Sequence, residues 1–101
     1  MATADITILG LRTGPDSHAS EYIAAIQKRL AAQERVGYRL HGMGTSLEGS
    51  ADDIFALAAE LHKVPFELGI PRVYTVLKLD DPSDKPGQSL ADKVRSVEDR
   101  L

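Results

Sequence analysis

A glycine-rich stretch near the middle of the chain, from Gly42 to Gly49, holds the residue types best suited to bind a small ligand. Between its three glycines stand the hydroxyls of Thr45 and Ser46 and the carboxylate of Glu48. Glycine permits tight turns and close approach of the backbone, whereas hydroxyls and carboxylates form directed hydrogen bonds. The stretch therefore predicts a turn feeding a strand that presents polar groups, either to a ligand or to solvent.

Each of these residues also has a purely structural explanation. Glu48 precedes a predicted helix, and a carboxylate near a helix N-terminus stabilises that helix by about 0.3 to 1 kcal/mol without any ligand. Thr45 suits a strand whatever it contacts, and Met43 fills a gap in a core as readily as it lines a ligand pocket. Both interpretations stay open at this point.

The three histidines do not have the spacing of a metal site. No two of them form an i, i+4 pair or an HExxH motif, and they stand on three separate predicted segments: His18, His41 and His62. An acidic loop is more typical of a solvated surface than of a cation site: Asp80, Asp81 and Asp84. We therefore expect neither a metal nor another cofactor.

The composition limits the class of protein. A chain of 101 residues forms one domain, spanning 1–101, and its 43% hydrophobic and 27% charged residues are typical of soluble globular proteins. A net charge of -3 argues against nucleic-acid binding, which needs a basic face. The chain has no cysteine, and its first residues carry neither a basic segment nor a long apolar run. We expect no membrane span and a cytoplasmic location.

Hydrophobic periodicity predicts a strand and a helix in the first third of the chain. Residues 4–9 alternate and are rich in β-branched types, which is typical of a strand. A helix is predicted from 17 to about 34, with Asp16 or Ser17 as its N-cap and Gly37 placed to end it. Its apolar stripe consists of Ala19, Tyr22, Ile23, Ile26 and Leu30.

The glycine-rich stretch connects two short predicted strands, 38–41 and 45–48. Ser50 is placed to cap a second helix, which Gly69 closes, and Pro65 predicts a bend or a break in that helix near residue 64. The apolar stripe of this helix consists of Ile54, Leu57, Ala58, Leu61 and Leu68.

The strongest predicted strand spans 72–80 and has apolar residues on both of its faces, which indicates that both faces are covered. Ser89 is placed to cap a final helix. The apolar stripe of that helix is narrow and suits either its own domain or a second subunit: Leu90, Val94, Val97 and Leu101.

This order of elements predicts an α+β fold of the ferredoxin-like βαββαβ type, with four antiparallel strands, two helices on one face and an added C-terminal helix. The other face has no helix of its own unless the last one reaches it. An apolar patch of Thr7, Leu9, Tyr74 and Val76 would then stand in water, and such patches mark partner surfaces. We expect a homodimer or homotetramer joined through sheet faces.

Several motifs together resemble one known family. They are Ser20-x-Tyr22, GMGTSLEG at 42–49, His62, RVYTVLKLDD at 72–81 and the terminal LADKVRSVEDRL, and they span essentially the whole chain. In this combination the chain resembles the small, single-domain YkoF-like thiamine-binding proteins of bacteria and archaea. One departure is Pro82, which stands where the family pattern suggests arginine.

The resemblance implies a ferredoxin-like subunit that assembles into dimers or tetramers and binds thiamine or its hydroxymethylpyrimidine part without catalysis. A pocket for an aminopyrimidine needs hydrogen-bond donors and acceptors beside an apolar wall. Glu48 could accept from the exocyclic amine, a bond worth about 1.5 to 3 kcal/mol, and Thr45 or Ser46 could bind the ring. The candidate ligand-binding residues are Ser20, Tyr22, Met43, Thr45, Ser46 and Glu48.

Three functions compete at this point. The first is a non-catalytic binding protein for thiamine or its pyrimidine, and the second is an oligomeric scaffold or regulatory domain without a small ligand. The third is a cofactor-free enzyme, such as a monooxygenase of the dimeric αβ-barrel kind; that site favours a buried His or an Asn-Trp pair, and the chain has no Trp. Titration with thiamine or hydroxymethylpyrimidine separates the first from the second, and the hypothesis predicts much weaker binding to Glu48→Gln.

Overall fold

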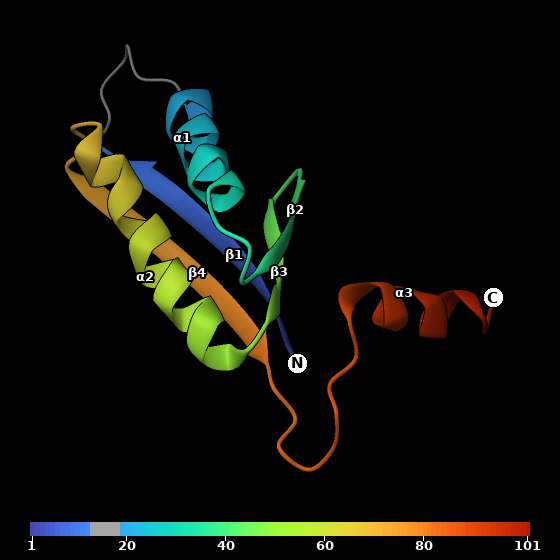
Figure 1. Cartoon of the computed structure of the whole chain (residues 1–101). Coiled ribbons are helices and arrows are strands. Elements are labelled where there is room, and N and C mark those ends of the chain that lie inside the picture. Colours follow the sequence, from blue (N-terminus) through green and yellow to red (C-terminus); the bar gives the residue numbers. More distant parts are fainter. Residues whose placement is uncertain (13–18) are drawn as a thin grey trace.

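The computed structural model describes residues 1–12 and 19–101, and its elements follow the predicted ferredoxin-like α+β order with an added C-terminal helix (Figure 1). The elements are β1 (Ala2–Leu11), α1 (Ala19–Ala31), β2 (Gly37–His41), β3 (Gly44–Gly49), α2 (Ala51–Glu67), β4 (Arg72–Asp80) and α3 (Leu90–Glu98). In the described part of the chain, no helix is long and apolar enough to cross a membrane.

The four strands form one antiparallel sheet in the order β2-β3-β1-β4. β1 is central, and its Ile6 pairs with Thr45 of β3 on one side and Leu77 of β4 on the other. Beyond Ile6, β1 continues beside β4 but no longer pairs with β3. Helices α1 and α2 pack side by side on one face of the sheet (Figure 1).

Strand alternation divides the side chains of the sheet between two environments. On β1, the even-numbered residues from Ala2 to Ile8 are buried under α1 and α2 and form the centre of the core. The odd-numbered residues of β1, and the even-numbered residues of β4 that pair beside them, lie on the opposite surface. We call this second surface the open face.

The first helix is shorter than predicted. It ends at Ala31, and Gly37 is the first residue of β2, so the prediction that Gly37 ends the helix is wrong. The side-chain amide of Gln33 holds the connection by bonding to the carbonyls of Leu30 and Val36 and to the Val36 N–H. The predicted N-caps, Asp16 and Ser17, lie outside the described residues.

The second helix begins as predicted, with Ser50 accepting a hydrogen bond from the Asp53 N–H at 3.1 Å. Of the bend or break predicted near residue 64, the break is absent, because the helix runs through Pro65 to Glu67. A proline so close to the end of a helix removes one backbone bond and leaves little helix to disrupt, and its ring is buried in the core. Gly69, in the left-handed region at φ 83°, follows the helix end as expected.

Helix α3 begins with the capping box of Ser89 and Asp92 and stands at one end of the open face. The Nζ atom of Lys93 lies 2.6 Å from Asp80 Oδ2 and 2.6 Å from Thr3 Oγ1. No residue of α3 is buried, and the helix extends away from the rest of the subunit (Figure 1). The terminal helix therefore reaches the open face but covers only one end of it.

Candidate functional site

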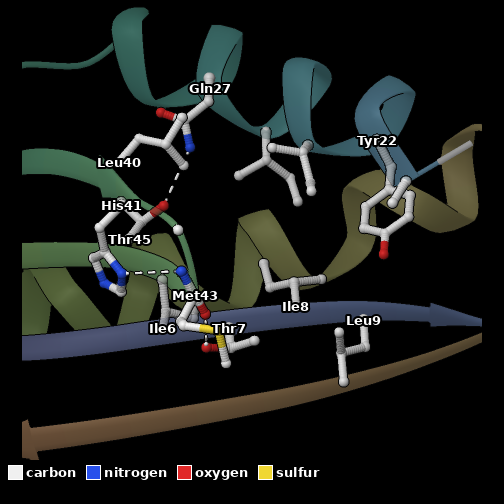
Figure 2. Close-up of a pocket in the computed structure, with 15 residues that line it drawn as sticks. Ile6, Thr7, Ile8, Leu9, Tyr22, Gln27, Leu40, His41, Met43 and Thr45 are labelled. Atoms are coloured by element: carbon white, nitrogen blue, oxygen red, sulfur yellow. Dashed lines mark hydrogen bonds between the residues drawn. The ribbon is translucent and has the colours of Figure 1, made fainter.

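A cavity of about 270 Å³ lies between α1, the central strand β1 and the turn that joins β2 to β3 (Figure 2). Its walls are mainly apolar and include Ile8 of β1, Ile23 and Ile26 of α1, and Leu40 of β2. The cavity exists because β3 stops pairing with β1 at Ile6, so the far half of β1 has α1 above it but no strand on that side.

A hydrogen-bonded pair forms the polar centre of the cavity. The Nε2 atom of Gln27 on α1 donates to Oγ1 of Thr45 on β3 at 3.1 Å (Figure 2). Thr45 is only 4% exposed, and its position beside Ile6 directs it toward the helices. The pair therefore places an amide and a hydroxyl against apolar walls, where hydrogen bonds to a ligand gain strength from the exclusion of water.

The ring of Tyr22 closes the cavity on the α1 side. Tyr22 is buried, as expected from its place on the apolar stripe of α1. A flat aromatic wall beside an amide and a hydroxyl is an arrangement suited to a planar, polar heterocycle.

The rim of the cavity is the turn that carries Met43, whose side chain is 81% exposed. The Thr7 hydroxyl donates to the Met43 carbonyl at 2.9 Å, and the Met43 N–H donates to Nδ1 of His41 at 3.2 Å. Nε2 of His41 lies 2.6 Å from Asp5 Oδ1. Because Nδ1 accepts, the proton resides on Nε2 and is donated to Asp5. Two residues of the open face, Thr7 and Asp5, therefore anchor the rim.

Packing in this turn requires glycine at position 44. A Cβ atom at this position would lie 2.6 Å from the Ile6 carbonyl oxygen and 2.8 Å from Thr7 Oγ1. Gly42 has no atom within 4 Å of the corresponding point. Only Gly44 is therefore required for the close approach of the turn to β1.

The structure brings three of the predicted site residues together and separates the other three. Tyr22, Met43 and Thr45 all line the cavity. Ser20 is exposed in the first turn of α1 and is not part of the lining. The remaining two, Ser46 and Glu48, lie on the open face of β3.

Glu48 has a structural partner on the open face. Its Oε2 atom accepts a hydrogen bond from the Leu90 N–H at the start of α3, at 3.0 Å. It also lines a groove of about 700 Å³ between α3 and the open face of β2 and β3. Since neighbouring strand residues alternate in direction, Glu48 and Thr45 cannot contact one ligand inside the cavity of a single subunit.

Sequence reasoning missed Gln27 and the coupling of His41 to the rim. Gln27 follows Ile23 by four residues and precedes Leu30 by three, so it lies on the inward side of α1 among apolar residues. A polar side chain at such a position was a usable signal. The His41 contacts with Asp5 and Met43 depend on the register of three strands and carry no local signal.

The histidines form no metal centre in the part of the chain that the structure describes. No cluster of three metal-binding side chains is present among those residues. His62 packs edge-on against Phe66, and its Nδ1 lies 2.6 Å from Thr75 Oγ1. His18 lies outside the described residues.

The sequence has close relatives across nearly its whole length. The sequence model of a family described as thiamine-binding protein matches residues 4–98. The UPF0045 protein YqgV of Bacillus subtilis is 38% identical over 104 residues, covering 100% of this chain and 98% of the relative. A UPF0045 protein of Methanothermobacter thermautotrophicus is 37% identical over 102 residues, covering 100% of both chains.

Solved structures share the fold. Hypothetical protein MJ1052 of Methanocaldococcus jannascii superposes with a TM-score of 0.82 at 25% identity, covering 96% of this chain and 95% of that chain. Protein TM0486 of Thermotoga maritima, described as a candidate thiamine biosynthesis or salvage protein, superposes with a TM-score of 0.76 at 20% identity. The latter alignment covers 95% of this chain and 97% of that chain.

Proposed function

Because the chain belongs to the thiamine-binding protein family, we propose that it binds thiamine, or the hydroxymethylpyrimidine part of thiamine, without changing it chemically. The family membership agrees with the resemblance that the sequence motifs carry. The ligand is our proposal, and the Gln27–Thr45 pair in the cavity is the observation that supports it most directly.

A side-chain amide is complementary to an aminopyrimidine. The exocyclic amine donates and the adjacent ring nitrogen accepts, and the carboxamide of Gln27 offers an acceptor and a donor at matching separation. Glutamine and asparagine bind the similar edge of adenine in this bidentate way. Thr45 Oγ1 already engages the Gln27 amide and thereby limits its rotation. The pair is therefore partly organised before a ligand binds.

The size of the cavity favours the pyrimidine over the complete thiamine molecule as the buried group. Small-molecule pockets usually enclose about 300 to 1,000 Å³, and this cavity has about 270 Å³. The thiazolium ring carries a permanent positive charge, and an apolar wall is a costly environment for an unpaired charge. We expect the pyrimidine inside the cavity and the thiazolium at the rim beside Met43.

The lining favours binding rather than catalysis. Among the described residues of the cavity wall, the titratable side chains are Tyr22 and His41. Both ring nitrogens of His41 are engaged, one by the Met43 N–H and the other by Asp5. A general base needs a free acceptor within reach of the substrate, and His41 offers none while it holds the rim.

Calorimetric titration with hydroxymethylpyrimidine and with thiamine tests the proposal. We expect wild type to bind, and Gln27→Leu to bind about tenfold to a hundredfold more weakly, because a hydrogen bond to a buried ligand group is lost without replacement. Thr45→Val, which keeps the shape of the side chain, should weaken binding in the same direction. Circular dichroism of each variant controls for folding.

Glu48→Gln is the matched control and also tests the hypothesis, based on the sequence, that Glu48 binds the ligand. A ligand in the cavity should bind this variant nearly as well as wild type, because Glu48 lies on the other face of the sheet. Loss of binding with Glu48→Gln but not with Gln27→Leu would instead place the ligand in the groove beneath α3. Absence of any heat or thermal shift in wild type would favour the scaffold or regulatory function.

A further inference from the structure

Two side chains of different chemistry hold the turn at the mouth of the cavity. The Thr7 hydroxyl donates to the Met43 carbonyl at 2.9 Å, and the Met43 N–H donates to Nδ1 of His41 at 3.2 Å (Figure 2). A threonine hydroxyl does not titrate, whereas an imidazole accepts a hydrogen bond only while it is neutral. One of the two anchors of the rim therefore depends on the protonation state of His41.

A second proton on the His41 ring removes this acceptor. Nε2 already donates its proton to Asp5 Oδ1 at 2.6 Å, so an added proton binds at Nδ1. Two N–H groups would then point at each other across the 3.2 Å between Nδ1 and the Met43 nitrogen. The Asp5 carboxylate attracts the charged ring and holds it in place. The turn, rather than the ring, is therefore the part that moves.

The turn is packed at one end and has space at the other. A Cβ atom at Gly44 would lie 2.6 Å from the Ile6 carbonyl oxygen, whereas one at Gly42 would have no atom within 4 Å. Met43, between the two glycines, is 81% exposed. Loss of the bond to His41 therefore leaves residues 42 and 43 free to move about a fixed point at Gly44.

The charged groups around His41 come from three strands. Asp5 contacts the ring directly, and the strand pairings place it in one row across the sheet with Arg39 and Lys78. The carboxylate favours the charged ring, and the two cations oppose it. On the helix side, Tyr22 is the titratable residue of the described cavity wall, and it lies at the opposite end of the cavity (Figure 2). Proton uptake by the ring therefore depends on one acid and two bases of the open face.

We propose that protonation of His41 opens the rim and lowers the affinity of the cavity for its ligand, so that the site binds in neutral solution and releases in mildly acidic solution. This inference rests on the proposed function, which places part of the ligand at the rim beside Met43. Proton and ligand then compete. Affinity is highest where the ring is neutral and falls as the pH is lowered through the titration of the ring.

NMR of the ligand-free protein tests the rim independently of any ligand. Histidine is the side chain that ordinarily changes charge between about pH 5 and 8, so the titration runs from about pH 8 to about pH 5.5. The amide signal of Met43 should shift along the same curve as the ring signals of His41. A Met43 signal that does not follow the ring would overturn the proposal, and so would a His41 ring that does not titrate in this range.

His41→Asn is the matched control. An asparagine side chain can accept a hydrogen bond from the backbone N–H two residues later, as in an Asx turn, but it does not titrate. The Met43 amide signal should therefore keep one position across the whole range in this variant. A shift of the same size as in wild type would show that another group moves the turn, and would overturn the role of His41.

Calorimetric titration with hydroxymethylpyrimidine at about pH 8 and about pH 5.5 tests the consequence for binding. Between these two conditions, wild type should lose about two- to twelvefold more affinity than His41→Asn, which is the effect of one hydrogen bond. Comparing the two proteins cancels the protonation of the ligand and of His18 and His62, because both proteins share these groups. Both conditions lie above the range in which Asp80 and Asp92, whose pKa values are lowered, take up protons.

The two measurements distinguish failure of this inference from failure of the proposed function. Equal loss of affinity in wild type and His41→Asn would overturn the regulation by His41 and leave ligand binding intact. Absence of heat with wild type under both conditions would overturn the proposed function, and with it the effect on affinity. The NMR titration would then still decide whether protonation releases the rim.

Discussion

His41 connects the rim of the cavity to the open face of the sheet. Its Nδ1 accepts the Met43 N–H, and its Nε2 binds the Asp5 carboxylate. The contact with Asp5 fixes the tautomer, and the tautomer in turn allows Nδ1 to accept. One imidazole therefore helps to position Met43, whose side chain is 81% exposed at the mouth of the cavity.

Replacement of His41 by leucine should loosen the rim. Loss of the acceptor for the Met43 N–H costs about 0.5 to 1.5 kcal/mol, so the exchange rate of that amide hydrogen should rise about two- to twelvefold. Hydrogen exchange followed by NMR measures this rate. Thr75→Val, which removes the distant His62 contact, is the control and should leave Met43 unchanged. Equal exchange of Met43 in wild type and His41→Leu would show that the imidazole does not hold the turn.

At the scale of residues, the sequence predicted part of the cavity. Tyr22, Met43 and Thr45 were found because an aromatic residue on a helical stripe and polar groups beside glycines are local signals. Glu48 was grouped with Thr45 although the two are three positions apart on one strand, and that spacing directs them to opposite faces. Gln27 was missed because a single polar residue on an apolar stripe contacts Thr45 only after the layers pack.

Two glycines of one turn should respond differently to the same substitution. Gly44→Ala should destabilise the fold by about 1 to 3 kcal/mol, because its Cβ would overlap the Ile6 carbonyl oxygen and backbone must shift. Gly42→Ala should be close to neutral, since nothing lies within 4 Å of its Cβ. Urea denaturation of both variants measures the difference. Equal stabilities would mean that the turn does not approach β1 as closely as the structure has it.

The stability of helix α3 should depend on pH through two carboxyl groups. Hydrogen bonding to Lys93 and the charge of Lys93 lower the pKa of Asp80, and hydrogen bonding with Ser89 lowers the pKa of Asp92. A carboxyl group whose pKa is lower in the folded state stabilises that state at pH values above the ordinary pKa of the group, which is 3.8 for aspartate. The stabilisation is lost as the pH falls through the lower, folded-state value.

We therefore expect α3 to detach and fray in acid before the sheet unfolds. Amide NMR signals of Val94 and Ser96 should shift toward unfolded positions as the pH falls below about 4, while those of Ile6 and Leu77 persist. Asp92→Asn, which can still accept from the Ser89 N–H, should reduce the pH dependence of the cap. Signals of α3 that stay constant down to pH 2 would contradict this assignment.

Elements were easier to predict than their ends. Alternation and helical stripes identified every strand and helix of the described residues, and the strand 72–80 was predicted with its observed bounds. Gly37 misled the helix prediction because Gln33 provides side-chain bonds that a local pattern does not reveal. Pro65 does not break the second helix, because the core covers the ring and the helix ends soon afterwards. Tertiary contacts decided both cases.

At the scale of the whole molecule, the cavity and the open face share residues. Thr7 and Asp5 project from the open face, yet they hold the turn that forms the rim of the cavity. A second copy that packs on the open face would restrict the same side chains. Ligand binding at the rim and assembly through the face should therefore be linked, and thermodynamic linkage requires the effect to be reciprocal.

Because linkage is reciprocal, the coupling between ligand binding and assembly can be measured in two independent experiments. Tyr74→Asp, which does not line the cavity, should weaken hydroxymethylpyrimidine binding by about five- to a hundredfold, the usual range of such coupling. Saturating ligand should lower the dissociation constant of a wild-type dimer by the square of that factor, because each of its two subunits binds one ligand and the changes close one thermodynamic cycle. Calorimetry measures the first factor, and sedimentation of a dilution series with and without ligand measures the second. If ligand leaves the dissociation constant unchanged while Tyr74→Asp still weakens binding, the substitution acts through local distortion of β4 and β1 rather than through assembly.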